Sequence, residues 1–210
     1  MGEPRTSTDN RVWQACLLAL VGGYADAVGF LTFNAFAGAM TGNTVLLGIA
    51  LAAHKLADAA QSAGIIAAFV VGVVVSILLR QVTSVAGILC LEMVAIILAA
   101  LVPSLAAAPI LALAMGLQNA AMTHFTGGTI NTVFLTGNLQ TLVHTVLTGQ
   151  AQGRTAEHQT IVLVGTFWLA YLAGIIAGAV AWHWTTQPLL FAALPLPLVL
   201  LRRSTWRSEG

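Results

Sequence analysis

The sequence predicts an all-α integral membrane protein that consists of two homologous halves, and two observations carry this prediction. Of the 210 residues, 58% are hydrophobic and only 7% are charged, with a mean hydropathy of +0.90. Soluble domains contain about 25% charged residues, so this composition indicates a chain embedded almost entirely in lipid. In addition, the tripeptide Thr-Gly-Asn occurs twice, and an apolar run follows each copy.

Polar tails and apolar runs define the expected organisation of the chain. A polar tail at residues 1–10 precedes the first apolar run, and a basic tail at residues 202–210 follows the last one. Between them we expect a first half at residues 11–102 and a second half at residues 103–201. Since Lys and Arg collect on the cytoplasmic side of a membrane, both tails are expected to be cytoplasmic.

Each half is expected to contain apolar spans and one broken element. Pro103 and Pro109 are expected to mark the joint between the halves. Residues 32–39 are expected to be irregular, and the polar, β-branched run at residues 123–134 to be extended. The spans themselves are expected at residues 11–31, 63–79, 85–102, 110–122, 159–182 and 188–201.

The two Thr-Gly-Asn copies predict two helix starts inside the membrane. These residue types are unfavourable in a helix interior, but Thr and Asn oxygens can accept hydrogen bonds from the amides of a first turn. Such a start in lipid requires protein or water around it, and its positive end favours an anion or a carbonyl-type oxygen. Alternatively, the two starts pack against each other without a ligand. The expected solute-binding residues here are Thr41, Gly42, Asn43, Thr136, Gly137 and Asn138.

The repeat extends beyond these tripeptides. The segment at residues 22–27 resembles that at residues 115–120, with Asp26 in the position of Asn119. A second match, in the order aromatic, glycine, small residue, pairs Phe69, Gly72 and Ser76 with Tyr171, Gly174 and Gly178. Small residues at this spacing let helices approach closely in lipid. Three matches in one order predict an internal duplication.

The topology depends on whether the broken elements cross the membrane. If they enter and return, the chain has about six spans and the halves are inverted; if they cross, it has about eight and the halves are parallel. The two arrangements differ in which of Lys55 and Arg80 is cytoplasmic, and the distribution of basic residues fits both equally well. We favour inverted halves, because opposed helix starts then meet near one midplane site.

Several of these residues resemble a known family. The segments at residues 22–27, 30–31, 40–43 and 47–48 are similar to those of the YoaK-like family of small bacterial membrane proteins of unknown function, over roughly residues 12–200. This resemblance implies about six spans and the bacterial cytoplasmic (inner) membrane, and it brings no established activity. The segment at residues 129–138 also has a looser, fold-level similarity to uracil-permease and sulfate-permease transporters, where short strands lead into half-helices.

Four polar residues within apolar runs are further candidates. Asp26 lies deep in the first span, where an ionised carboxylate is costly; it is either a proton- or cation-coupling site or an internal cap for the broken element. Its counterpart Asn119 cannot titrate, and the adjacent Gln118 either binds solute or bonds a neighbouring helix. Glu92 either faces the site as a second coupling candidate or has a structural role, in a pair with Arg80 or protonated at a subunit contact.

These features predict a transporter or channel for a small polar or anionic solute bound between the two helix starts, with proton or cation coupling. The first alternative is a membrane scaffold or accessory subunit. A second, weaker alternative is an intramembrane enzyme that uses Asp26 and Glu92. No enzyme motif or helical metal-ligand spacing is present, so we expect no catalytic residues, metal or cofactor. A net charge of +1 gives no basis for nucleic-acid binding, whereas the small-residue faces favour a homodimer.

Overall fold

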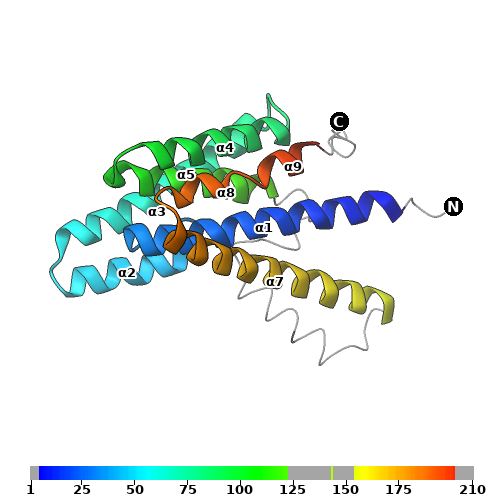
Figure 1. Cartoon of the computed structure of the whole chain (residues 1–210), viewed down its shortest axis with the longest axis horizontal. Helices are drawn as coiled ribbons and strands as arrows, with labels where there is room; N and C mark the ends of the chain where they lie inside the picture. The colour runs from blue at the N-terminus through cyan, green and yellow to red at the C-terminus, as the bar shows by residue number, and fades with distance from the viewer. Residues whose placement is uncertain (1–4, 123–142, 144–153, 202–210) are drawn as a thin grey trace.

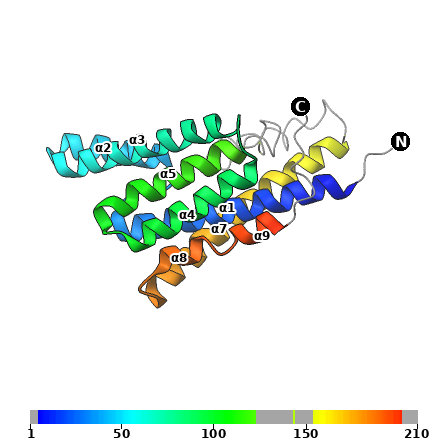
Figure 2. The ribbon, with the colours of Figure 1, turned by 90° about the horizontal axis from the view of Figure 1, so that it is seen from above.

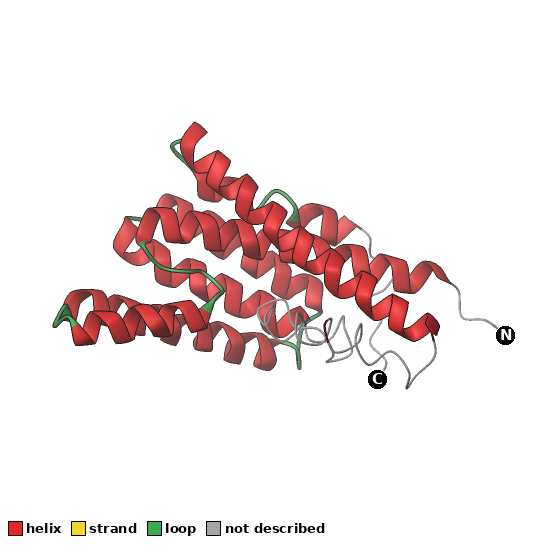
Figure 3. Cartoon of the chain, turned by 90° about the horizontal axis from the view of Figure 1, so that it is seen from below, coloured by secondary structure: helices red, strands yellow, loops and turns green. Residues whose placement is uncertain are grey.

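The computed structural model describes residues 5–122, 143 and 154–201, and over these residues it contains helices and no strand (Figure 3). Three helices contain segments long and apolar enough to cross a membrane, namely Val12–Phe33, Leu56–Leu79 and Val164–Trp184. The prediction of an all-α chain with membrane-type helices is therefore confirmed for the described residues. In order the helices are α1 (Arg5–Phe33), α2 (Met40–Ala52), α3 (Leu56–Leu79), α4 (Val85–Leu101), α5 (Ser104–Met122), α7 (Arg154–Trp184), α8 (Pro188–Ala192) and α9 (Leu196–Leu201).

Helix α1 lies at the centre of the bundle, with α7 along one side of it and α5 on another (Figures 1 and 2). More than half of its apolar stretch, 56%, is buried inside the protein, against 28% for α3 and 22% for α7. The outer helices therefore present large apolar side chains outward, such as Val70, Val74 and Ile77 of α3. An apolar outer surface around a buried central helix suits a lipid environment.

Helices α1 and α7 run side by side in the same direction and meet at glycines. A Cβ atom added at Gly23 would lie 2.1 Å from the backbone oxygen of Tyr171, and one added at Gly174 would lie 2.1 Å from that of Leu20. Real Cβ atoms do not approach a backbone oxygen so closely, so this crossing requires glycine on both helices.

Helices α3 and α5 also run in the same direction, opposite to α1 and α7, and they meet in the same manner (Figure 2). A Cβ atom added at Gly72 would lie 2.2 Å from the backbone oxygen of Leu113, and one added at Gly116 would lie 2.2 Å from that of Phe69. The side chain of Ser76 donates to the backbone oxygen of Leu117 across the same contact, at 3.1 Å. The two close crossings thus join the four longest described helices in pairs, α1 with α7 and α3 with α5.

Some expected boundaries are wrong. Pro109 does not lie at a helix boundary, because α5 begins at Ser104 and contains Pro109 within it. A proline near the start of a helix removes only one bond, here to the carbonyl of Leu105, which is exposed. The expected span at residues 188–201 consists of two short helices, and the span expected at residues 159–182 is helical from Arg154 to Trp184. The run expected to be extended, residues 123–134, lies outside the described residues.

Candidate functional site

Residues 34–39 interrupt the helical structure between α1 and α2, and we call this segment the break. Asn34 adopts a left-handed conformation with φ of 54°, which Asn tolerates better than most residues. The segment then turns back along α1, since a Cβ atom at Gly29 would lie 3.0 Å from the backbone oxygen of Ala35. Helix α2 therefore begins beside the interior of α1 and not beyond its end.

The first Thr-Gly-Asn copy lies in the first turn of α2, but it does not cap the helix as expected. The N-cap residue is Ala39, and no side chain caps the free amides of the first turn. Thr41 is exposed, and the space next to Gly42 is filled by the ring of Phe36, whose nearest atom would lie 2.7 Å from an added Cβ. The capping role expected of Thr41 and Asn43 is therefore wrong for α2.

Asn43 instead binds the break. Its Oδ1 accepts a hydrogen bond from the amide of Phe36 at 2.9 Å, and its Nδ2 donates to the carbonyl of the same residue at 2.7 Å. The Asn43 side chain is fully buried, and the Phe36 ring stacks on Phe30 with a centroid separation of 4.9 Å. One side chain thus satisfies both backbone groups of a residue that has no helical partner.

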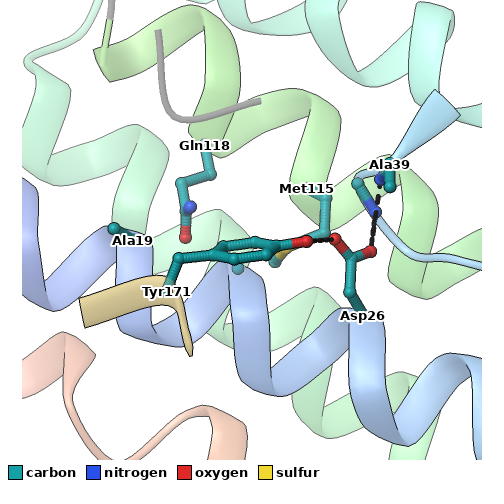
Figure 4. A pocket seen from close by; sticks show the side chains of 8 residues that line it. Ala19, Asp26, Ala39, Met115, Gln118 and Tyr171 are labelled. Atoms are coloured by element: carbon teal, nitrogen blue, oxygen red, sulfur yellow. Dashed lines mark hydrogen bonds between the residues drawn. The ribbon is translucent and has the colours of Figure 1, made fainter. Parts of the chain in front are cut away.

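The side chain of Asp26 on α1 accepts hydrogen bonds from the backbone amides at the end of the break. Its Oδ1 accepts from the amide of Gly38 at 2.6 Å and from that of Ala39 at 3.2 Å, and its Oδ2 accepts from the hydroxyl of Tyr171 on α7 (Figure 4). The side chain is 4% exposed. No basic side chain among the described residues pairs with it: its partners are backbone amides of the break and the Tyr171 hydroxyl.

A small cavity of about 30 Å³ lies next to this carboxylate, between α1, the break, α5 and α7. It has room for about one or two water molecules. Gln118 projects into it from α5 (Figure 4), and its Nε2 donates to the backbone oxygen of Leu18 at 3.0 Å. The Oε1 atom of Gln118 is buried and has no hydrogen-bond partner in the described part of the protein. Asp26 and Gln118, both expected site residues, are thus brought to one cavity.

The remaining expected residues lie elsewhere. Asn119 is half-buried on α5, does not line the cavity, and leaves its Oδ1 without a partner among the described residues. Glu92 is fully buried on α4, and neither of its carboxyl oxygens has a partner in the same residues. The expected pairing of Glu92 with Arg80 is therefore wrong. Thr136, Gly137 and Asn138 lie outside the described residues.

Tyr171 is the site residue that sequence reasoning missed. It was used only as the aromatic member of a repeat match with Phe69. The signal was available in that match, because a hydroxyl is the one difference between the two side chains and a buried Tyr hydroxyl needs a partner. Its partner Asp26 is 145 positions away in the chain, and local sequence carries no information about such a contact.

Comparison with known proteins places the chain in a family. A family model described as a protein of unknown function (DUF1275) matches residues 14–201. The chain belongs to the DUF1275 family. This membership agrees with the YoaK-like resemblance, and the match covers the whole site of this DUF1275 protein. No curated protein and no solved structure matches the chain, so the looser similarity of this family member to permease-type transporters stays a prediction.

Proposed function

We propose that this protein is a membrane transporter or channel for a small polar solute, whose path passes the break and Asp26. The observation that carries the proposal is a buried carboxylate beside a cavity, at a helix interruption within an apolar bundle. Asp26 lies about 10 Å along α1 from its end at Phe33, from the 1.5 Å rise per residue. Charged residues at such depth are costly and mark ion or solute pathways in membrane proteins.

The proposal includes two homologous, inverted halves. Its support is that the α3–α5 crossing repeats the α1–α7 crossing at the positions that the sequence match pairs: Gly23 and Tyr171 correspond to Gly116 and Phe69. Helix α5, which would open the second half, runs opposite to α1 (Figure 1). Helix α2 has 13 residues and is about 20 Å long, less than the ~30 Å of a hydrocarbon core. A break that enters and returns fits these dimensions, with about six crossings in total.

The carboxylate at the first helix start limits the charge that the proposed solute can have. The amides that precede α2 are already engaged by the Asp26 carboxylate. An anionic solute at this end would meet a negative charge, so we propose a neutral polar or cationic solute here, with coupling to a proton or a cation at Asp26. An anion would require the second Thr-Gly-Asn start, at residues 136–138.

The alternative function, a membrane scaffold or accessory subunit, has specific support of its own. Asp26 and Asn43 together satisfy the amides of Phe36, Gly38 and Ala39, which is what an internal cap for a break requires. In that case the polar groups hold the fold and no solute passes. The two functions predict different results when Asp26 is neutralised. If Asp26 serves transport, the neutral variant keeps the fold and loses activity. If Asp26 only caps the break, the fold itself is affected.

Uptake by purified protein in liposomes tests the proposed function. A panel of neutral and cationic metabolites is offered with and without proton and Na⁺ gradients. We expect uptake by the native protein, its loss in Asp26→Asn, and its retention in the matched control Gly48→Ala, a position on α2 with nothing within 4 Å of an added Cβ. If no solute of the panel is taken up, or if Asp26→Asn transports as well as the native protein, the scaffold function is favoured.

Side-specific labelling tests the topology. Lys55 lies between α2 and α3, and Arg80 follows α3. With Cys16 and Cys90 replaced by Ser, a membrane-impermeant thiol reagent should label Lys55→Cys in intact cells and Arg80→Cys only after the membrane is opened. The opposite result would support parallel halves with about eight crossings. The inner-membrane location, the cytoplasmic termini and the homodimer remain predictions that the same cells and the purified protein can test.

A further inference from the structure

The cavity beside Asp26 runs along the side chain of one tyrosine. Figure 4 shows the Gln118 amide at the Cβ end of Tyr171, next to Ala19. The Asp26 carboxyl group lies at the hydroxyl end of the same ring. Residues from both ends line the cavity, with Ala19 at the first end and Gly38, whose amide binds Asp26, at the second. The polar groups of the cavity are therefore separated by the length of the ring, and no single small ion or water molecule reaches both ends.

Two glycines keep this space open. A Cβ atom added at Gly22, in the interior of α1, would lie 3.7 Å from Nε2 of Gln118 and 4.0 Å from Cε2 of Tyr171. One added at Gly38 would lie 3.7 Å from Oδ1 of Asp26. These are ordinary contact distances and neither glycine has a left-handed backbone, so packing and conformation do not require glycine at either position. Alanine would favour the helix at Gly22, but it would take volume from the cavity.

The lining of the cavity includes a polar atom that needs a donor. The Oε1 atom of Gln118 has no partner among the described residues, although the side chain is only 3% exposed. A buried oxygen without a donor is costly, and cavities that stay dry are apolar. The cavity volume of about 30 Å³ holds two water molecules, since each takes up roughly 10–15 Å³ of such a space. It is far smaller than the ~150 Å³ cavity that holds benzene, so a metabolite does not fit.

We propose that two water molecules fill this cavity, one behind the other along the Tyr171 ring, and carry protons to and from Asp26. The first donates a hydrogen bond to Oε1 of Gln118. The second contacts the Tyr171 hydroxyl and the Asp26 carboxyl group, and the two bind each other, so each has at least two polar partners. The inference rests on the proposed function in that it makes the proton the coupling ion, whereas the water and the proton exchange are measured without any solute.

The contacts of Asp26 suit both of its protonation states. The amides of Gly38 and Ala39 can only donate, and both donate to Oδ1. Oδ2 contacts the Tyr171 hydroxyl, which can donate to a carboxylate or accept from a carboxylic acid. A proton that arrives from the water bonds to Oδ2, either directly or through the Tyr171 oxygen, which gives its own proton to Oδ2 as it takes one from the water. The reverse transfer empties the site, and the break stays bound to Oδ1 in both states.

Radiolytic footprinting of the purified full chain in detergent tests for the water. Hydroxyl radicals that X-rays form from a bound water molecule oxidise the side chains next to it. Met115 lines the cavity and is only 2% exposed, so its oxidation in the native protein requires water inside. The double variant Gly22→Ala/Gly38→Ala puts two methyl groups into the cavity at ordinary contact distances and should remove this oxidation. The matched double variant Gly48→Ala/Gly64→Ala adds methyl groups where nothing lies within 4 Å and should leave it unchanged.

Infrared spectroscopy of the same protein tests the proton path. The acid form of Asp26 gives a carboxyl band that is absent from Asp26→Asn, and the band shifts when its proton is replaced by deuterium in D₂O. This exchange should slow roughly tenfold or more in Gln118→Leu, which loses the acceptor of the first water molecule. It should also slow in Gly22→Ala, which interrupts the pair. If Asp26→Asn does not fold, Tyr171→Phe identifies the band by a change in its frequency, because one hydrogen bond to Oδ2 is lost.

Gln14 provides a matched control for Gln118. It is also a fully buried glutamine whose Nε2 donates to a backbone oxygen, that of Val199 at 3.2 Å, and whose Oε1 has no partner in the described residues. It does not line the cavity. Gln14→Leu should therefore lower the thermal unfolding midpoint to a similar extent as Gln118→Leu and leave the exchange of the Asp26 band as in the native protein.

Three outcomes would overturn the proposal. The first is Met115 oxidation that is the same in the native protein and in the variant with the filled cavity. The second is equal exchange of the Asp26 band in Gln118→Leu and Gln14→Leu. The third is the absence of an Asp26 acid band at every pH at which the protein is folded.

The tests also separate this inference from the proposed function. Among the described residues, the groups that face Asp26 are Tyr171 on α7, Gln118 and Met115 on α5, and the amides of the break. Fast exchange of the Asp26 band without uptake of any solute would retain the water path and reject the transport function. Uptake by Gly22→Ala at the native rate would retain transport and reject the water path.

Discussion

Replacement of Asn43 by Leu removes the side chain that holds the break in place. Two hydrogen bonds are lost, from the Phe36 amide at 2.9 Å and to the Phe36 carbonyl at 2.7 Å. A buried polar group left without a partner costs about 1–3 kcal/mol, so two such groups cost about 2–6 kcal/mol. Because Phe36 is only half-buried and water can reach it in part, we expect the lower end of this range, about 2–3 kcal/mol.

This cost should appear as local opening and not as unfolding of the whole bundle. The amide of Phe36 belongs to the break, so its hydrogen exchange measures the free energy of opening there. A loss of about 2 kcal/mol corresponds to roughly 30-fold faster exchange, at about 1.4 kcal/mol for each factor of ten. Hydrogen exchange with mass spectrometry in detergent micelles should locate this increase in peptides that contain residues 34–39.

Thr41→Val serves as the control, since Thr41 lies in the same turn of α2 but is exposed and makes no cap. It should leave exchange within about twofold of the native protein, as surface substitutions usually change stability by no more than ~0.5 kcal/mol. Equal exchange rates in Asn43→Leu and Thr41→Val would refute the clamp. A loss of transport in Asn43→Leu would therefore partly reflect a loosened break.

Three further changes test separate parts of the structure. Gly23→Ala should lower the thermal unfolding midpoint by several degrees, because its Cβ would meet the Tyr171 backbone oxygen at 2.1 Å, whereas Gly48→Ala on α2 should raise it slightly; equal midpoints would contradict the close crossing. Glu92→Gln should fold with unchanged or higher stability, since both carboxyl oxygens lack partners in the described residues, and a marked loss of folded protein in size-exclusion chromatography would reveal a missing ionic partner. Tyr24→Phe removes the hydrogen bond from its hydroxyl to the carbonyl of Pro188 at 2.8 Å and should lower stability by about 1 kcal/mol in thermal unfolding; no change would mean that water replaces this bond.

Membrane helices were predictable because burial in lipid is largely a property of local composition. Helix α4 covers the expected span at residues 85–102 except for its last residue. Helix α3 ends where the expected span at residues 63–79 ends, but it begins earlier, at Leu56. The irregular segment before the first Thr-Gly-Asn copy was predictable for the same local reason, as Gly and Asn weaken a helix. The start of α5 was not predictable, because a proline near the start of a helix interrupts the helix less than a proline in its middle.

The partners of polar residues were the least predictable feature. Capping rules assign a Thr or Asn oxygen to amides within its own helix, yet Asn43 binds Phe36, seven residues earlier. The amides preceding α2 are bound by Asp26, which is 12 residues from Gly38, and one of the two readings of Asp26, an internal cap, anticipated that contact. Tyr171 and Gln118 reach the same place from α7 and α5, and their convergence depends on packing of helices that no local pattern encodes.

The two close helix crossings are alike in backbone geometry but differ in the chemistry beside them. At matched positions, the first crossing carries Asp26 and Tyr171, and the second carries Asn119 and Phe69. Each difference removes a group that can hold or donate a proton or bind a cation. Asp26 also accepts hydrogen bonds from the amides of Gly38 and Ala39, so an internal cap accounts for a carboxylate at the first crossing. Under the proposed function, the same difference would confine proton or cation coupling to that crossing, since Asn119 and Phe69 cannot titrate.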